Sequence, residues 1–188
     1  MRPVLDGTID SGGIQRPEDV VVWDPLVRVF HWALVAAFVT AWVSAEEIGV
    51  VHRSAGYVIV GLVAFRVLWG LVGPRHARFA SFIWRPSAVL TFLADTARFR
   101  ARRHLGHNPA GGAMVVALLV MLAAITTTGI MMTTDAFWGA RWVRELHELS
   151  VNVAVVLIVV HVLGVVLASV EHRENLVVAM VTGRKRPR

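Results

Sequence analysis

The stretch ELHELSVNVAVVLIVVHVLGV, at residues 145–165, decides the fold. It runs into an apolar segment of about twenty residues, which is the length that a helix needs to cross a bilayer. His147 and His161 stand fourteen positions apart in it. Fourteen residues make just under four helical turns, so both side chains project from one face, about 21 Å apart along the axis. The stretch therefore predicts a membrane-spanning helix with two histidines at different depths.

Three further apolar segments of similar length precede this one. The four segments occupy residues 29–44, 55–72, 113–132 and 151–170. Each is expected to be helical, because lipid cannot satisfy the backbone polar groups of an open sheet. Of the 188 residues, 56% are hydrophobic and 17% are charged, whereas soluble domains are about 25% charged. These observations predict an all-α integral membrane protein, built as a four-helix bundle.

The loop between the second and third segments, residues 74–112, is long and basic. Within it, residues 86–103 place apolar side chains among arginines, which predicts an additional amphipathic helix on the cytoplasmic membrane surface. We divide the chain into a cytoplasmic N-terminal segment at 1–22, a four-transmembrane-helix domain at 23–182 and a basic tail at 183–188. The first 22 residues lack the basic-then-apolar pattern of a signal peptide, so none is expected.

The distribution of basic residues predicts the orientation. The chain has 19 Lys and Arg and a net charge of +6. Fifteen of these 19 lie in the N-terminal region, the long loop and the tail, and three lie in the two short connections. Positive loops stay in the cytoplasm, so both termini and the long loop are expected there. The same charge would contact lipid phosphates, and no nucleic-acid partner is expected.

Four of the eight histidines lie at helix positions that pair by depth. His52 and His147 both begin their segments at the outer face, whereas His31 and His161 both lie toward the inner face. We therefore expect one His52–His147 pair and one His31–His161 pair inside the bundle, where cofactors usually bind. The remaining histidines are interpreted as solvated loop or tail residues: His76, His104, His107 and His172.

Haem suits a two-histidine site better than zinc does. Zinc prefers four tetrahedral protein ligands, whereas haem supplies four nitrogens and needs only axial ligands. The chain has no cysteine, which excludes disulfides, thiolate metal sites, iron–sulfur clusters and covalent haem attachment through cysteine. The pattern predicts two bis-histidine haems, with His31, His52, His147 and His161 as iron ligands.

Small and basic residues near these histidines suggest how haem would fit. Gly56 and Gly164 lie on the same helix faces as His52 and His161, which would give either clearance for haem or close helix packing. Arg66 lies inside the second segment, fourteen residues after His52. It either pairs with propionates of the inner haem or extends to the interface. Weaker candidates for propionate contact flank the predicted ligands: Arg28, Arg53 and Arg144.

Five motifs together resemble one known family. They are VWDPLVRVFHW at 22–32, HRSAGYVIVGLVAFRVLWGLVGPRHARF at 52–79, GHNPAGG at 106–112, ELHELSVNVAVVLIVVHVLGV at 145–165 and EHRENLVVAMVTGRK at 171–185. The chain from residue 22 onward resembles the bacterial di-haem cytochrome b family, which includes bacterial cytochrome b561 and the cytochrome b subunit of nickel–iron hydrogenases.

The resemblance implies a multi-pass protein of the bacterial inner membrane with two b-type haems. It implies that His31, His52, His147 and His161 are the axial ligands. It also implies electron transfer between membrane quinone and a periplasmic redox protein, either hydrogenase-like or a c-type cytochrome, in a homo- or hetero-oligomer. The sequence does not locate a quinone site or a catalytic residue. It does not settle whether the chain is an electron-transfer subunit or a quinone-linked oxidoreductase.

Other functions stay open at the level of sequence. The electron donor could be a formate dehydrogenase or superoxide, the latter by quinone-linked oxidation. A non-redox transporter or scaffold would have to explain the depth-matched histidines without a cofactor. A haem-delivery protein would need an exchangeable axial ligand.

Overall fold

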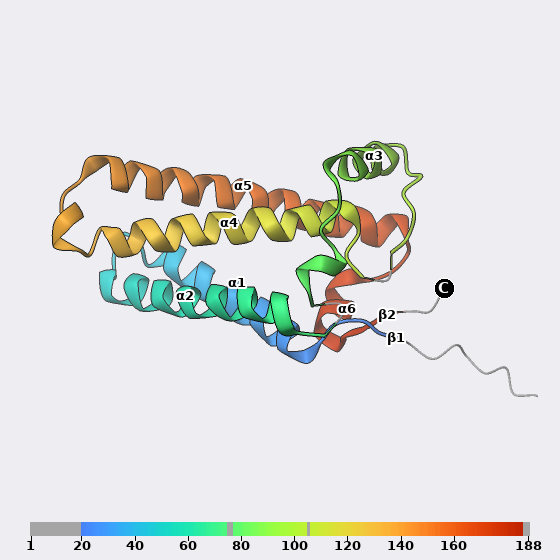
Figure 1. The fold of residues 1–188 in the computed structure, drawn as a ribbon, viewed down its shortest axis with the longest axis horizontal. Coiled ribbons are helices and arrows are strands. Elements are labelled where there is room, and N and C mark those ends of the chain that lie inside the picture. Colours follow the sequence, from blue (N-terminus) through green and yellow to red (C-terminus); the bar gives the residue numbers. More distant parts are fainter. Residues whose placement is uncertain (1–19, 75–76, 105, 186–188) are drawn as a thin grey trace, which may run out of the picture.

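A computed structural model describes residues 20–74, 77–104 and 106–185, and it contains four long helices (Figure 1). They are α1 (Pro25–Val43), α2 (Gly49–Val72), α4 (Pro109–Met131) and α5 (Arg141–Glu171). All four are long and apolar enough to cross a membrane. The predicted all-α bundle of four spans is therefore confirmed.

The bundle consists of two helical hairpins. Helix α1 packs against α2, α4 packs against α5, and contacts between α2 and α4 join the hairpins. The buried core between them is built from small and medium apolar side chains: Ala37, Ala41, Ala55, Ile59 and Leu122. Small residues let helix backbones approach closely in lipid, where no hydrophobic force draws helices together.

Two helix starts are fixed by local sequence. Asp24 caps α1, because its Oδ1 accepts hydrogen bonds from the backbone N–H groups of Leu26 (2.9 Å) and Val27 (3.2 Å). Asn108 caps α4 in the same way, with its Oδ1 accepting from Gly111 N at 2.6 Å. Each cap is followed by a proline at the first helical position, where the missing N–H is not needed. These caps set the level at which α1 and α4 begin.

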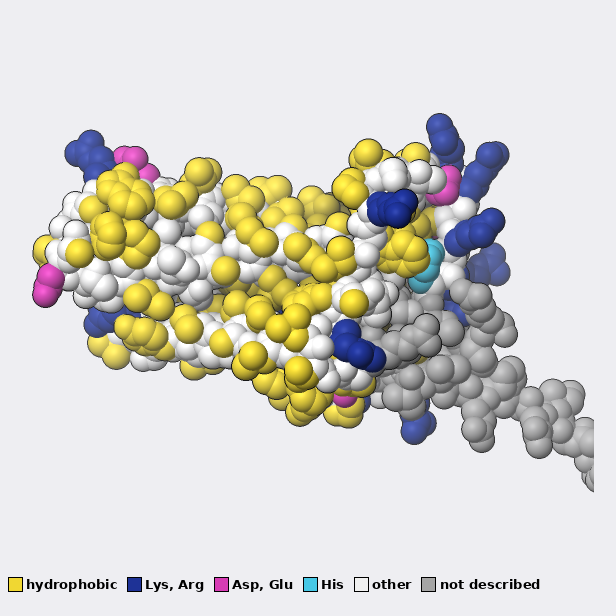
Figure 2. All heavy atoms as spheres, in the orientation of Figure 1, with side chains coloured by type: hydrophobic (Ala, Val, Ile, Leu, Met, Phe, Trp, Pro, Cys, Tyr) yellow, Lys and Arg dark blue, Asp and Glu magenta, His cyan; other side chains and the backbone are white. Residues whose placement is uncertain are grey.

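The two ends of the bundle differ. The turn end has the short α1–α2 and α4–α5 connections, the second of which includes η2 (Asp135–Phe137). The termini end has α3 (Pro86–Ala97), α6 (Leu176–Thr182) and both described chain ends (Figure 1). Apolar side chains cover the middle of the bundle in Figure 2, and basic side chains gather mostly at the termini end.

The amphipathic helix α3 is shorter than predicted. It ends at Ala97 rather than Arg103, because Phe99 adopts a left-handed backbone with φ of 54°. The backbone N–H groups of Arg98 and Arg100 both bond to Asp95 O, which closes the helix end. Helix α6 follows the fourth span within the domain predicted at 23–182, and it was not expected.

A short antiparallel ladder joins the two described chain ends. Strand β1 (Val20–Val21) pairs with β2 (Arg184–Lys185). Val22 N and Trp23 N both donate to Gly183 O, at 2.9 and 3.1 Å, and Gly183 turns the chain there with φ of +80°. We refer to residues 20–24 and 181–185 as the termini clasp. It connects the predicted N-terminal segment to the tail, although residues 1–19 lie outside the described part of the chain.

Lys185 is the buried charge of the termini clasp. Its side chain is only 6% exposed, and its Nζ lies 5.6 Å from the centroid of the Trp23 ring. Nearby, Arg103 Nη2 and Glu174 Oε1 form an ion pair at 3.1 Å. Burial, and secondarily the charge of Arg103, lowers the pKa of Lys185, while Glu174 acts in the opposite direction. Burial of the Lys185 ammonium group in the clasp therefore costs free energy.

Candidate functional site

The structure brings His52 of α2 and His147 of α5 together near the turn end. Their ring centroids are 6.3 Å apart, and the ring planes are inclined by 71°. Two imidazoles that bind one iron from opposite sides, with metal–nitrogen bonds of about 2 Å, have centroids about 6 Å apart. The His52–His147 pair therefore has the separation that axial ligation of a single haem requires.

Backbone carbonyls fix the orientation of both rings. His52 Nδ1 lies 2.8 Å from Ala41 O, and His147 Nδ1 lies 3.0 Å from Ile125 O. A carbonyl oxygen can only accept, so each Nδ1 must donate its hydrogen. The neutral rings then keep the lone pair on Nε2, which is the tautomer that ligates metal. The pair thus presents two Nε2 atoms that can bind metal, while the Nδ1 atom of each ring is already hydrogen-bonded.

Two residues of α4 support His147 and were missed in the sequence analysis. Thr128 Oγ1 lies 3.1 Å from His147 Nδ1 and donates its own hydrogen to Ala124 O at 2.7 Å. Gly129 faces the ring, since a Cβ there would lie 3.4 Å from His147 Cε1. Counting back from the α4–α5 turn would have placed these residues level with His147, so the depth argument could have found them.

The second predicted pair, His31 of α1 and His161 of α5, lies at the other depth. Both side chains are half-buried, and they are close enough to interact electrostatically. The described residues offer no hydrogen-bond partner to His31 Nδ1, which is buried. His31 and His161 thus lie on the expected helices, but among the described residues His31 has no backbone anchor like those of both rings in the other pair.

Arg66 is buried in α2 with an unsatisfied charge. Its side chain is only 3% exposed, and its Nη1 has no hydrogen-bond partner among the described residues. Its guanidinium lies 4.8 Å from the Phe79 ring centroid and 5.8 Å from that of Phe82. Such cation–π contacts are worth about 0.5–2 kcal/mol. A charge within a span costs about 2.5–3.5 kcal/mol. The cation–π contacts therefore offset only part of this cost, and a bound anion would offset more of it.

The predicted glycines have free space beside them. A Cβ built on Gly56 or on Gly164 would meet no heavy atom within 4 Å. Neither glycine is therefore used for close packing against a described helix, and a flat ring could lie next to either. This observation favours clearance over helix packing as the reason for these two glycines.

The three weaker arginine candidates lie outside the histidine pairs. Arg28 belongs to the termini end, where its Nη2 donates a hydrogen bond to Val181 O, while its buried Nε has no partner among the described residues. Arg53 and Arg144 are exposed near the turn end. The structure does not bring any of the three into a described contact with a histidine ring of either pair.

The other described histidines pack at the termini end. His107 lies between Trp23 and Phe82, with ring centroids 4.7 and 4.5 Å away. His104 contacts Trp84 and Phe92. His76 lies outside the described residues. Within the described ranges, no three His, Cys, Asp or Glu side chains converge on a point where they could hold a metal ion.

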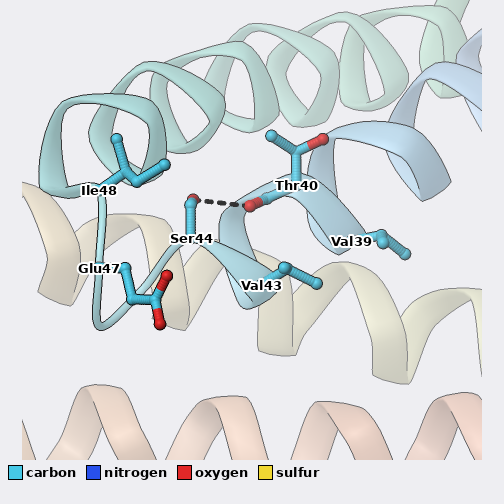
Figure 3. A pocket seen from close by; sticks show the side chains of 6 residues that line it. All are labelled: Val39, Thr40, Val43, Ser44, Glu47 and Ile48. Carbon is cyan, nitrogen blue, oxygen red and sulfur yellow. Dashed lines mark hydrogen bonds between the residues drawn. The ribbon is translucent and has the colours of Figure 1, made fainter.

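A surface pocket of about 390 Å³ lies at the turn end (Figure 3). It is lined by Val39, Thr40, Val43, Ser44, Glu47 and Ile48. The Ser44 hydroxyl donates to Thr40 O at 2.7 Å, as drawn in Figure 3, so it is already paired. The residues that line the pocket include one carboxylate and no histidine.

Comparison with known proteins gives a consistent result. Residues 22–183 match the model of the family described as prokaryotic cytochrome b561. Similar curated proteins include the "probable Ni/Fe-hydrogenase B-type cytochrome subunit" of Azotobacter vinelandii, 25% identical over 95% of both chains. The protein of that name from Rhodobacter capsulatus is 23% identical over 94% of this chain and 85% of its own. The "probable Ni/Fe-hydrogenase 1 B-type cytochrome subunit" of Escherichia coli is 25% identical over 64% of each chain. No solved structure matches the chain.

Proposed function

Because the chain belongs to the prokaryotic cytochrome b561 family, and is thus a multi-pass b-type cytochrome that transfers electrons in a membrane, we propose that it holds two haems. One is ligated by His52 and His147, and the other by His31 and His161. The observation that supports this most directly is the His52–His147 geometry, with centroids 6.3 Å apart and both Nδ1 atoms held by carbonyls.

The ligand set determines the chemistry. When bound, haem iron would supply reversible one-electron transfer, and ligation by two histidines would favour electron transfer over oxygen binding. The chain's own contribution is to orient the imidazoles, as the carbonyls of Ala41 and Ile125 do for His52 and His147. His147 and His161 lie on one helix and differ in height by about 21 Å. The two sites would therefore relay electrons between the two membrane faces.

The glycines and arginines would complete the sites. Gly56 and Gly164 would leave room for the ring edges, since the space beside both is open. Arg66 would neutralise a propionate of the haem held by His31 and His161, because its buried guanidinium needs an anion. Arg28, Arg53 and Arg144 remain weaker candidates for propionate contacts at the two ends.

The same proposal includes the redox partners of the chain and its orientation in the membrane. The relatives named above are called probable Ni/Fe-hydrogenase B-type cytochrome subunits, which supports a hydrogenase-like protein as one redox partner. The proposal adds that this partner is periplasmic and that the chain exchanges electrons between it and membrane quinone. The excess of Lys and Arg at the termini end supports a cytoplasmic location for that end in the bacterial inner membrane. The turn end, with His52 and His147, would then face the periplasm. The domain limits at 22 and 182 belong to this proposal.

The haem content of single variants tests the ligand assignment. The purified chain should contain two haems per polypeptide and show two reducible b-type components. His52→Ala and His147→Ala should each remove the same component, and His31→Ala and His161→Ala should each remove the other, because an iron that loses one axial ligand is released or becomes high-spin. Reduced-minus-oxidised spectra and a haem-to-protein ratio measure both effects.

His172→Ala is the matched control, because this histidine lies beyond the end of α5 and is not proposed as a ligand. It should leave both components unchanged. A colourless wild-type protein would refute the proposal. Loss of one and the same component from His147→Ala and His161→Ala would show that the pairing is wrong.

A further inference from the structure

Arg66 and Trp69 stand three residues apart in α2, and both have a buried N–H group without a partner. Arg66 Nη1 and Trp69 Nε1 are each buried from solvent and make no hydrogen bond within the described part of the chain. Residues three apart on a helix lie on neighbouring positions of its surface. An apolar environment penalises each unpaired donor, and one negatively charged acceptor could satisfy both.

Arg66 is closed off from solvent at the termini end by an aromatic cover. The cover consists of Phe79, in the short helix η1 (Phe79–Ser81), and Phe82, which follows it. A Cβ on Gly70 would collide with the Phe79 ring, and one on Gly112 would collide with the Phe82 carbonyl. These glycines therefore let the cover lie directly against α2 and α4. The Arg66 guanidinium, under both rings, cannot extend to water to be solvated.

The level of this site matches that of the His31–His161 pair. Phe65, next to Arg66, packs against Phe30, next to His31, with ring centroids 6.3 Å apart. Arg66 is also fourteen residues from His52, the same number that separates His161 from His147. Both relations place Arg66 at the depth of His31 and His161 rather than at that of His52.

We propose that Arg66 and Trp69 together form a buried anion site that binds a carboxylate, and that this carboxylate is a propionate of the haem held by His31 and His161. The inference rests on the proposed function, and it adds Trp69 as a second donor. A cation held beside a haem favours the reduced iron. The site would therefore raise the midpoint potential of this haem and keep its propionate ionised throughout the neutral pH range.

The test is a redox titration of both haem components in Arg66→Gln and Trp69→Phe, compared with the wild type. Arg66→Gln should lower the midpoint potential of the His31–His161 component. It should also make that potential depend on pH, because the propionate then takes up a proton. Trp69→Phe should cause a smaller shift in the same direction, since the phenyl ring keeps the stacking on Phe65 but lacks the N–H. The His52–His147 component should not move.

Arg141→Gln is the matched control, because it removes an exposed arginine at the start of α5, at the turn end, and should leave the His31–His161 component unchanged. Arg66→Lys keeps a positive charge, and it replaces Arg66→Gln in the redox titration if Arg66→Gln does not fold. It should give an intermediate shift.

Two haems with unchanged, pH-independent potentials in Arg66→Gln and Trp69→Phe would overturn this inference and leave the proposed function intact. Loss of a bound phospholipid from these variants without a potential shift, detected by mass spectrometry, would also overturn it by identifying a phosphate as the anion. A wild-type chain without haem would overturn both proposals.

Discussion

His52 and His147 are each held from behind by a backbone carbonyl of a neighbouring helix. The depth of these histidines could be read from the sequence by counting along antiparallel spans, and the structure brings the two together. The acceptors Ala41 O and Ile125 O could not be predicted, because every helix residue has a carbonyl and side-chain packing decides which one a ring reaches. For the same reason the sequence did not show that His31 Nδ1 would find no such acceptor in the described part of the chain.

Gly56 offers a test at the level of one residue. Gly56→Leu should remove the haem component of the His52–His147 pair, because the new side chain would fill the open space beside that pair. Gly61→Leu is the control, since Gly61 is on the same helix, is exposed and also has open space beside it. It should retain both components. Haem spectra together with the elution volume in detergent separate loss of cofactor from loss of fold. A Gly56→Leu protein with both components would argue against haem clearance.

The helices were predictable to different degrees. The four spans follow from their apolar length, and their caps at Asp24 and Asn108 are local signals that structure and sequence share. The end of α3 was misplaced, because nothing in the arginine-rich stretch after Ala97 forbids a helix, and the left-handed conformation at Phe99 is not one that its residue type favours. Helix α6 was missed because seven residues are too few for a periodic pattern.

The contact between the aromatic cover and α4 gives a prediction at the level of elements. Gly112→Ala should lower the free energy of unfolding by about 1–3 kcal/mol, because the methyl group would force the Phe82 backbone away. Gly61→Ala should be neutral or stabilising by about 0.5–1 kcal/mol, since it adds a helix-favouring residue in open space. Unfolding of both variants in one detergent makes the comparison. Equal stability of the two would show that the cover does not press on α4.

At the scale of the whole molecule, the termini clasp was beyond prediction. Its strands are two residues long and pair Val21 with Arg184, far apart in sequence. No alternation of apolar and polar residues is detectable in so short a strand, and a basic tail gives no hint that its lysine is buried. The family resemblance did extend to residue 185, but it implied nothing about contact between the ends.

Burial of Lys185 predicts how the stability of the clasp depends on pH. The pKa of this lysine lies below its ordinary value of 10.5, so the unfolded chain binds more protons between these two values. The free energy of unfolding should therefore rise with pH across that interval. Lys185→Met should abolish the rise, which thermal unfolding at a series of alkaline pH values would reveal. Arg184→Met, which removes an exposed cation beside it, should preserve the rise. If the free energy of unfolding of Lys185→Met still rose with pH to the same extent, deprotonation of Lys185 would not be the cause of the rise.

The ladder between β1 and β2 also implies an order of assembly. Its second strand is synthesised after all four spans, so the ladder can form only once the whole bundle has been made. Once the ladder forms, backbone hydrogen bonds hold the residues before the first span beside those after the last, so the two hairpins are joined at their free ends as well as through the long connection.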